Sequence, residues 1–329
     1  MTDYVIGVDL GGTRLRAALM DDDLTIHARH EVLTEARDGF DATFGRIKQL
    51  VRAVLPEDQG GNDALLGIGV SIPGPTNPFK GIVELGTNLA GWRDIPLASL
   101  LQDEFHTPVF LGNDANVAAL AEATRGAGRG YRHVIFVTVS TGIGSGIIVD
   151  GHLLLGKDGL AAEAGHIVML VDGEFTTLEK QTAGPSLARQ ARVRIQAGET
   201  SLISGLVNGE LSKISGKTVG EALRAGDALA ASIVNRAGTV LGGGMASLLH
   251  LFNPEILIFG GGVSAIGDPL FDPMRVAIEV NCIDKAYWRN LKIEMAALGE
   301  NVSLIGAGAL VLTRGGVEDL SAVKAALED

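Results

Sequence analysis

The chain has 329 residues, of which 46% are hydrophobic, and this length favours two folded domains over one. Its formal net charge of -12 argues against a non-specific nucleic-acid partner or a membrane surface. The single cysteine, Cys282, excludes an intramolecular disulfide. No apolar stretch reaches about 18 residues and no signal-like segment precedes the first apolar run, so we expect a soluble, cytoplasmic protein.

A glycine turn between two strands is the first chemical motif. Strands are predicted at residues 4–10 and 15–20, joined by Gly11-Gly12-Thr13-Arg14. The glycines let backbone amides approach a phosphate, Thr13 offers a hydroxyl, and Asp9 is suited to hold a metal-bound water. A strand follows the glycines, whereas Walker and Rossmann motifs require a helix there.

The next part of the chain alternates strands and helices. Asp21, Asp22 and Asp23 are interpreted as a solvated turn rather than a metal site. The predicted elements that follow are a helix at residues 40–55, a strand at 65–72 and a helix at 95–105. Pro73-Gly74-Pro75 directly follows the strand. In the irregular region between them, Asn88 near Trp92 either binds a hydroxyl or forms an Asx turn.

A carboxylate at a strand-to-helix junction is the strongest catalytic candidate. The apolar run at residues 109–111 ends in Gly112-Asn113-Asp114 and continues as an alanine-rich, helix-forming segment. Ligands of open α/β sheets bind at the carboxyl ends of strands, which is where Asp114 is predicted. Asn113 or Asp114 is also a typical helix cap. The residues alone leave both roles open.

The strand–glycine turn–strand pattern then recurs. A strand is predicted at residues 134–139, a glycine turn at 140–146 and a returning strand at 147–149, followed by a hairpin turn at Asp150-Gly151. Two such hairpins predict two related halves that hold one polyphosphate from both sides.

Three polar residues follow the second hairpin. Glu163, His166 and Glu179 are either metal ligands or hydrogen-bonding partners of a polar substrate. A zinc site would need thiolates or further histidines, and residues 167–185 contain neither. Hydrogen bonding is therefore favoured, with solvated loop charges as the alternative.

The C-terminal part is predicted to be helical as far as Phe252, and a strand then follows at residues 256–259. Gly260-Gly261-Gly262 forms a third glycine turn, which suits the base and ribose of a nucleotide. A strand at 291–295 and helices at 306–313 and 320–327 complete the pattern. No low-complexity linker is present, so the domain boundary is expected near the helix that begins at Asp114.

With these motifs in order, the chain resembles the ROK family (repressors, open reading frames and sugar kinases), and within it the bacterial glucokinases. The resemblance covers residues 6 to about 313, and it is specific because the motifs occur as an ordered set. They are Asp9-Leu10-Gly11-Gly12-Thr13, Pro73-Gly74-Pro75, Asn88-Leu89-Ala90-Gly91-Trp92, Asn113-Asp114-Ala115-Asn116, Thr141-Gly142-Ile143-Gly144-Ser145-Gly146, Glu163-Ala164-Gly165-His166, Leu178-Glu179 and Gly260-Gly261-Gly262.

The resemblance implies an α/β protein with the actin-like ATPase (ribonuclease H-like) fold, in which two α/β domains surround a cleft. The N-terminal domain would comprise residues 1–115, and a C-terminal helix at about 305–329 would return to it. Residues 116–304 would form the larger C-terminal domain. A homodimer is also implied.

The resemblance further implies an ATP-dependent kinase that phosphorylates a hexose hydroxyl with Mg²⁺, glucose to glucose 6-phosphate being the expected reaction and Asp114 the general base. The implied sugar-binding residues are Gly74, Asn88, Asn113, Asp114, Glu163, His166 and Glu179. The implied donor-binding residues are Asp9, Gly11, Gly12, Thr13, Thr141, Gly142 and Gly144 for the phosphates, and Gly261 and Gly262 for the adenosine.

One departure from the family pattern concerns metal. The family usually has a cysteine-rich zinc loop between the segment that holds His166 and the later glutamate, but residues 167–178 are short and contain no cysteine. Zinc is therefore not expected, and His166 need not be a ligand. The alternatives are a kinase of an N-acetylhexosamine, fructose or allose, and a non-catalytic sugar sensor. Repressors of the family carry an N-terminal DNA-binding domain, whereas this chain enters its first glycine turn within a dozen residues.

Overall fold

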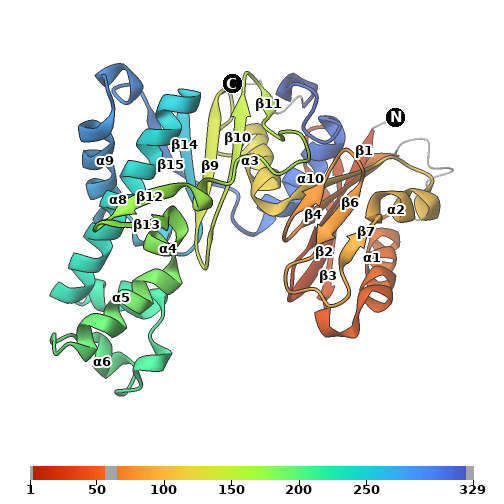
Figure 1. Ribbon diagram of the computed structural model, residues 1–329. Helices are drawn as coiled ribbons and strands as arrows, with labels where there is room; N and C mark the ends of the chain where they lie inside the picture. Colours follow the sequence, from red (N-terminus) through yellow and green to blue (C-terminus); the bar gives the residue numbers. More distant parts are fainter. Residues whose placement is uncertain (1–2, 56–64, 324–329) are drawn as a thin grey trace. The chain divides into compact units, whose positions relative to one another are not determined.

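The computed structural model describes residues 3–55 and 65–323 (Figure 1). Contacts group the described residues within 1–136, 146–162 and 296–329 into one compact unit, called unit 1 here. Those within 137–145 and 163–295 form unit 2. The division near residue 115 remains a prediction, and each unit is described by itself.

A five-stranded mixed sheet forms the centre of unit 1. Its strands, in spatial order, are β3 (Ile26–Leu33), β2 (Arg14–Asp21), β1 (Tyr4–Leu10), β4 (Leu65–Ile72) and β8 (Val109–Asn113). β1 pairs antiparallel with β2 and parallel with β4, and β4 pairs parallel with β8. The predicted strands at 4–10 and 65–72 are confirmed. β3 was not predicted, because most of its side chains are exposed and it lies at the edge of the sheet.

Helices cover both faces of this sheet. On one face, α1 (Phe40–Val54) buries Ile47, Leu50 and Val51 and contacts β1, β2 and β3 (Figure 1). On the other, α10 (Val302–Leu312) contacts β1, β4 and β8. The strands lie very close to α10, since a Cβ added to Gly69 of β4 would be 1.7 Å from the carbonyl oxygen of Ala307. Glycine is thus required where helix and sheet approach.

In the rest of unit 1, one predicted helix begins later than expected. The remaining elements are β5 (Thr76–Asn77), β6 (Ile82–Leu85), β7 (Arg93–Ile95), α2 (Leu97–Phe105) and α3 (Asp114–Arg125). The helix predicted from residue 95 begins at Leu97, because Arg93 and Ile95 pair with β6 and Pro96 is the N-cap residue. Proline favours the start of a helix and not its interior.

A second five-stranded sheet has the order β11 (His152–Leu153), β10 (Ile143–Val149), β9 (Val134–Val139), β14 (Ile256–Gly260) and β15 (Lys292–Met295). The helices of unit 2 are α4 (Leu178–Thr182), α5 (Gly184–Gln196), α6 (Ile203–Leu206), α7 (Gly216–Arg224), α8 (Ala228–Phe252) and α9 (Asp268–Asn281). α8 contacts α4, α5, α7 and α9 and is thus the central helix of the unit. The predicted helical region up to Phe252 is confirmed, although several turns interrupt it.

The segment that lacks cysteines folds as a β-hairpin. It comprises β12 (Val168–Val171) and β13 (Glu174–Thr177), which pair antiparallel. Asp172 and Gly173 at the turn both have positive φ angles (53° and 83°), as two-residue hairpin turns of type I′ require. Arg236 of α8 donates a hydrogen bond to Asp172 at 2.5 Å. The pairing of its two strands and a hydrogen bond from α8 therefore hold this segment.

The predicted helix at 320–327 is only partly described. Leu320–Ala322 form one short 3₁₀ turn, and residues from 324 on lie outside the described part of the chain. The predicted helix at 306–313 begins earlier, as α10 at Val302. Among the described helices, none has the length and apolarity needed to cross a membrane.

An ion pair fixes the last described residues of unit 1. Asp319 accepts hydrogen bonds from Arg132 (2.5 Å) and from the amide of Ser321 (2.8 Å). These donors hold the pKa of Asp319 well below its usual range. A group with a lowered folded pKa contributes stability above its unfolded pKa, and that stability is lost as the pH falls toward the folded value.

We therefore expect Asp319→Asn to lower the unfolding midpoint at pH 7 slightly, by the equivalent of a few tenths to about 1 kcal/mol for a partly exposed pair. The difference from wild type should shrink as the pH falls below about 4. Thermal unfolding of both proteins from pH 7 to pH 3 measures this. A difference that stays constant over that range would contradict the role given to Asp319.

Candidate active site

The structure decides which residue of the Asn113-Asp114 pair caps the helix. Asn113 ends β8 and is the N-cap of α3, since its Oδ1 accepts a hydrogen bond from the amide of Ala115 at 2.9 Å. Asp114 is the first residue of α3, is exposed, and accepts from the same amide at 2.8 Å. The helix N-terminus favours the ionised carboxylate. An exposed, oriented carboxylate at a strand end has the position that a general base requires.

Two predicted sugar-binding segments lie beside this junction in unit 1. The side-chain amide of Asn113 donates to the carbonyl oxygen of Gly74 at 3.4 Å. Gly74 has a φ of 112°, and an added Cβ would be 2.3 Å from the carbonyl oxygen of Leu85, so only glycine fits. Asn88 is exposed, and its Cβ lies 3.6 Å from the Cβ position of Gly12. Gly74 with Asn113, and Asn88 with Gly12, are thus neighbours in space.

The first glycine turn is a closed loop between β1 and β2. The amide of Gly11 donates to the carbonyl oxygen of Arg14 at 3.0 Å, and an added Cβ on Gly11 would be 2.7 Å from that oxygen. Thr34 donates from its hydroxyl to the carbonyl of Gly11 at 2.6 Å and from its amide to that of Thr13 at 2.9 Å. Thr34 therefore holds the turn from outside the motif. The sequence carried no signal for this role.

Asp9 forms an ion pair with Arg16. Its Oδ2 accepts from Nε of Arg16 at 2.9 Å and from NH2 of Arg16 at 2.5 Å, and Asp9 is 8% exposed. Burial raises the pKa of Asp9, while Arg16 opposes this shift. A buried carboxylate already paired with arginine does not fit a direct magnesium ligand. The predicted role of Asp9 at the phosphates remains a prediction.

The second glycine turn is held by Glu179. The Oε2 of Glu179 accepts a hydrogen bond from the amide of Ile143 at 2.8 Å, and a Cβ on Gly142 would be 2.7 Å from the same oxygen. The amide of Ser140 donates to the carbonyl oxygen of Gly142 at 2.8 Å. The structure therefore places Glu179, predicted to bind sugar, against the turn that was predicted to bind phosphate. Its contact with sugar remains a prediction.

Glu163 and His166 belong to the same neighbourhood in unit 2. Both are exposed, and they flank a 3₁₀ turn over Ala164–His166. The amide of Ala164 donates to the hydroxyl of Ser145 at 3.0 Å, which attaches the turn to β10. Glu179 and this turn are thus bound to the same short stretch of β10. Two exposed polar side chains are thereby presented on a fixed backbone.

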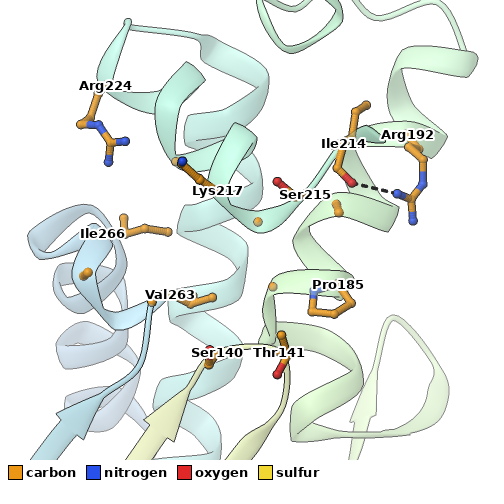
Figure 2. A pocket seen from close by; sticks show the side chains of 16 residues that line it. Ser140, Thr141, Pro185, Arg192, Ile214, Ser215, Lys217, Arg224, Val263 and Ile266 are labelled. Atoms are coloured by element: carbon orange, nitrogen blue, oxygen red, sulfur yellow. Dashed lines mark hydrogen bonds between the residues drawn. The ribbon is translucent and has the colours of Figure 1, made fainter. Parts of the chain in front are cut away.

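A cavity of about 620 Å³ lies in unit 2, a size typical of sites for small molecules (Figure 2). It brings Thr141 of the second glycine turn together with Gly262 of the third. The amide of Gly184 donates to the carbonyl oxygen of Ser140 at 2.8 Å, which links this turn to the start of α5. Thr141 and Gly262 therefore line one cavity, as a shared nucleotide site requires.

Most of the cavity was not predicted from the sequence. Gly142, Gly144 and Gly261 are not among its lining residues. Its full lining is Ser140, Thr141, Gly184, Pro185, Ala188, Arg192, Ile214, Ser215, Gly216, Lys217, Gly220, Arg224, Gly262, Val263, Ala265 and Ile266. An added Cβ on Gly216 would be 2.8 Å from the Cα of Gly184, so two chain segments meet there. For the part of the cavity that α5 and α7 form, the sequence signal was the isolated glycine that begins each helix.

The model of the ROK family matches residues 5–314. The chain belongs to the ROK family. The glucokinase of Thermotoga maritima is a ROK relative 33% identical over 316 residues, which is 94% of this chain and 98% of that protein. The resemblance predicted from the ordered motifs is confirmed.

Two solved ROK structures are similar to this chain. A glucokinase from Streptomyces griseus, in complex with glucose and AMPPNP, is 32% identical with a TM-score of 0.72, covering 93% of this chain and 98% of that one. A hexokinase from Thermus thermophilus is 28% identical with a TM-score of 0.76, covering 93% and 97%. The fold is therefore the predicted α/β, actin-like ATPase fold of the ROK kinases.

Proposed function

We propose that this protein is an ATP-dependent hexose kinase that converts glucose to glucose 6-phosphate. The observation that carries the proposal is the glycine-lined cavity of unit 2, which joins a hydroxyl-bearing turn at Thr141 to an apolar surface at Val263 and Ile266. A nucleoside triphosphate has the same two parts, a polar phosphate chain and an apolar base. The ROK glucokinase bound to glucose and AMPPNP supports the same function.

In the proposed reaction, Asp114 takes the proton from the attacking sugar hydroxyl. A positioned base of this kind accelerates transfer by roughly 10²- to 10⁴-fold. The backbone of the second glycine turn, fixed by Glu179, would stabilise charge that develops on the transferred phosphoryl group. Magnesium would be carried mainly by the phosphates of the donor, which is its usual binding mode in kinases.

Asn88, Asn113, Glu163 and His166 are proposed to bind sugar hydroxyls. All four offer polar groups, and the segments of Asn113 and Asn88 adjoin Gly74 and Gly12 within unit 1. Discrimination between hexoses depends on a few such hydrogen bonds. N-acetylhexosamines, fructose and allose are therefore the competing substrates.

The test is a coupled assay of ADP release with ATP, Mg²⁺ and a panel of hexoses. Turnover with glucose at a kcat/KM well above the other sugars is the expected result. Faster turnover of another hexose would support the kinase activity but identify that hexose, and not glucose, as the substrate. No turnover with any hexose, together with measurable sugar binding, would identify a sugar sensor instead.

The protein is also proposed to form a homodimer, as the family resemblance implies. Light scattering coupled to size-exclusion chromatography measures this directly. A mass of about twice the 34.2 kDa of one chain is expected. A monomer at micromolar concentration would contradict the proposal.

A further inference from the structure

The cavity of unit 2 is chemically asymmetric (Figure 2). Ser140 and Thr141 lie at one end of it. Arg192 and Arg224 lie at the other end on opposite sides, with Lys217 on the side of Arg224. Val263, Ile266 and Pro185 supply apolar surface in between. A donor whose phosphates lie at the Thr141 end would therefore have the edge of its base facing the cationic end.

Side chains that accept hydrogen bonds are scarce at the cationic end. None of the 16 lining residues, all of them in the described part of the chain, is an aspartate, glutamate, asparagine or glutamine. The carbonyl oxygen of Ile214 already accepts a hydrogen bond from Arg192 at 3.1 Å. The hydroxyl of Ser215 is engaged in the capping box of α7 with Thr218. The side chains that face a base there are donors.

This pattern favours one kind of purine edge. Guanine presents two adjacent acceptors, O6 and N7, which arginine binds with two hydrogen bonds. Adenine presents the N7 acceptor beside an N6 amino donor, which asparagine or glutamine matches. A site with arginines and without carboxamides therefore fits guanine better than adenine.

Of the three cationic side chains, Arg224 is the best placed to donate hydrogen bonds to that edge of the base. Arg192 is fixed by its bond to Ile214, and Nζ of Lys217 lies 3.9 Å from the carboxylate of Glu221. Arg224 makes no ion pair with any of the residues that the structure describes. Its guanidinium lies over Ile266 at the lining of the cavity (Figure 2). All its donors remain available to a ligand.

We propose that the donor pocket binds guanine nucleotides at least as well as adenine nucleotides, and that Arg224 determines this specificity. The inference rests on the proposed kinase function, because it concerns the donor of the same reaction. It widens the donor class from ATP to purine nucleoside triphosphates with an acceptor edge, which includes GTP and ITP.

The test compares kcat/KM for ATP and GTP with the hexose that supports turnover. Wild-type protein is expected to use GTP at least as well as ATP. Arg224→Gln replaces a guanine-binding group with an adenine-binding one, so the GTP/ATP ratio should fall by about tenfold or more. Lys213→Gln, which removes the same charge from an exposed residue outside the cavity, should leave the ratio unchanged. A wild-type kcat/KM that is higher for ATP than for GTP, or a GTP/ATP ratio that Arg224→Gln does not change, would overturn the proposal.

Calorimetric titration with GDP and with ADP, without sugar, separates this inference from the proposed function. Binding of GDP at least as tight as that of ADP, weakened in Arg224→Gln, supports the pocket assignment even if no hexose is phosphorylated. Turnover with ATP alone, together with selective binding of ADP, would leave the kinase function standing and refute the role of Arg224.

Discussion

Asp114→Asn is expected to reduce kcat by about 10²- to 10⁴-fold while leaving sugar affinity nearly unchanged. The asparagine has almost the same shape, and its side-chain oxygen can still accept the hydrogen bond from the amide of Ala115. Asn113 continues to cap α3. The variant should therefore fold normally and lack only the group that takes the proton.

The measurement pairs steady-state kinetics with calorimetric titration of glucose. Asp41→Asn is the matched control, because Asp41 is also an exposed aspartate in the first turn of a helix of unit 1. It should retain wild-type kcat. If Asp114→Asn kept a kcat near that of wild type, the base would have to be another residue.

The elements of the fold could be predicted where the chain is strongly apolar or rich in glycine. The buried strands β1, β4, β9 and β14 appear where the apolar runs predicted them. β3 and β7 were missed because their side chains are largely exposed, so their pairing partners decide their structure. The start of α10 was missed by several residues, since element boundaries depend on tertiary contacts.

The candidate site was predictable only where it lies in contiguous motifs. Asn113 and Asp114 are adjacent, and their separation into cap and candidate base needed the hydrogen bonds of α3. The hydrogen bond from the amide of Ile143 to Glu179 joins residues 36 positions apart, and no sequence pattern predicts it. The same holds for Arg192 and Arg224, which lie on α5 and α7. A cavity formed by several helices has no local signature.

Gly69→Ala is expected to have the largest effect on stability. The added methyl would be 1.7 Å from the carbonyl oxygen of Ala307, which is backbone of the buried helix α10 and cannot rotate away. Overpacking a core costs about 1–3 kcal/mol when side chains can adjust, and more when they cannot. We expect a loss of at least about 3 kcal/mol, seen as a large drop in the thermal unfolding midpoint or as failure to accumulate soluble protein.

Gly45→Ala is the control for this variant. Gly45 lies within α1 with nothing within 4 Å of an added Cβ, so alanine should stabilise the protein by about 0.5–1 kcal/mol. Gly69→Ala should also affect function, because α10 contacts α3. A Cβ added to Gly306 of α10 would be 2.0 Å from the carbonyl oxygen of Val117 of α3. A shift of α10 away from β4 would therefore displace the helix that begins at Asp114. A Gly69→Ala protein with the wild-type midpoint and wild-type kcat would contradict both the packing of α10 on β4 and its support of the helix that begins at Asp114.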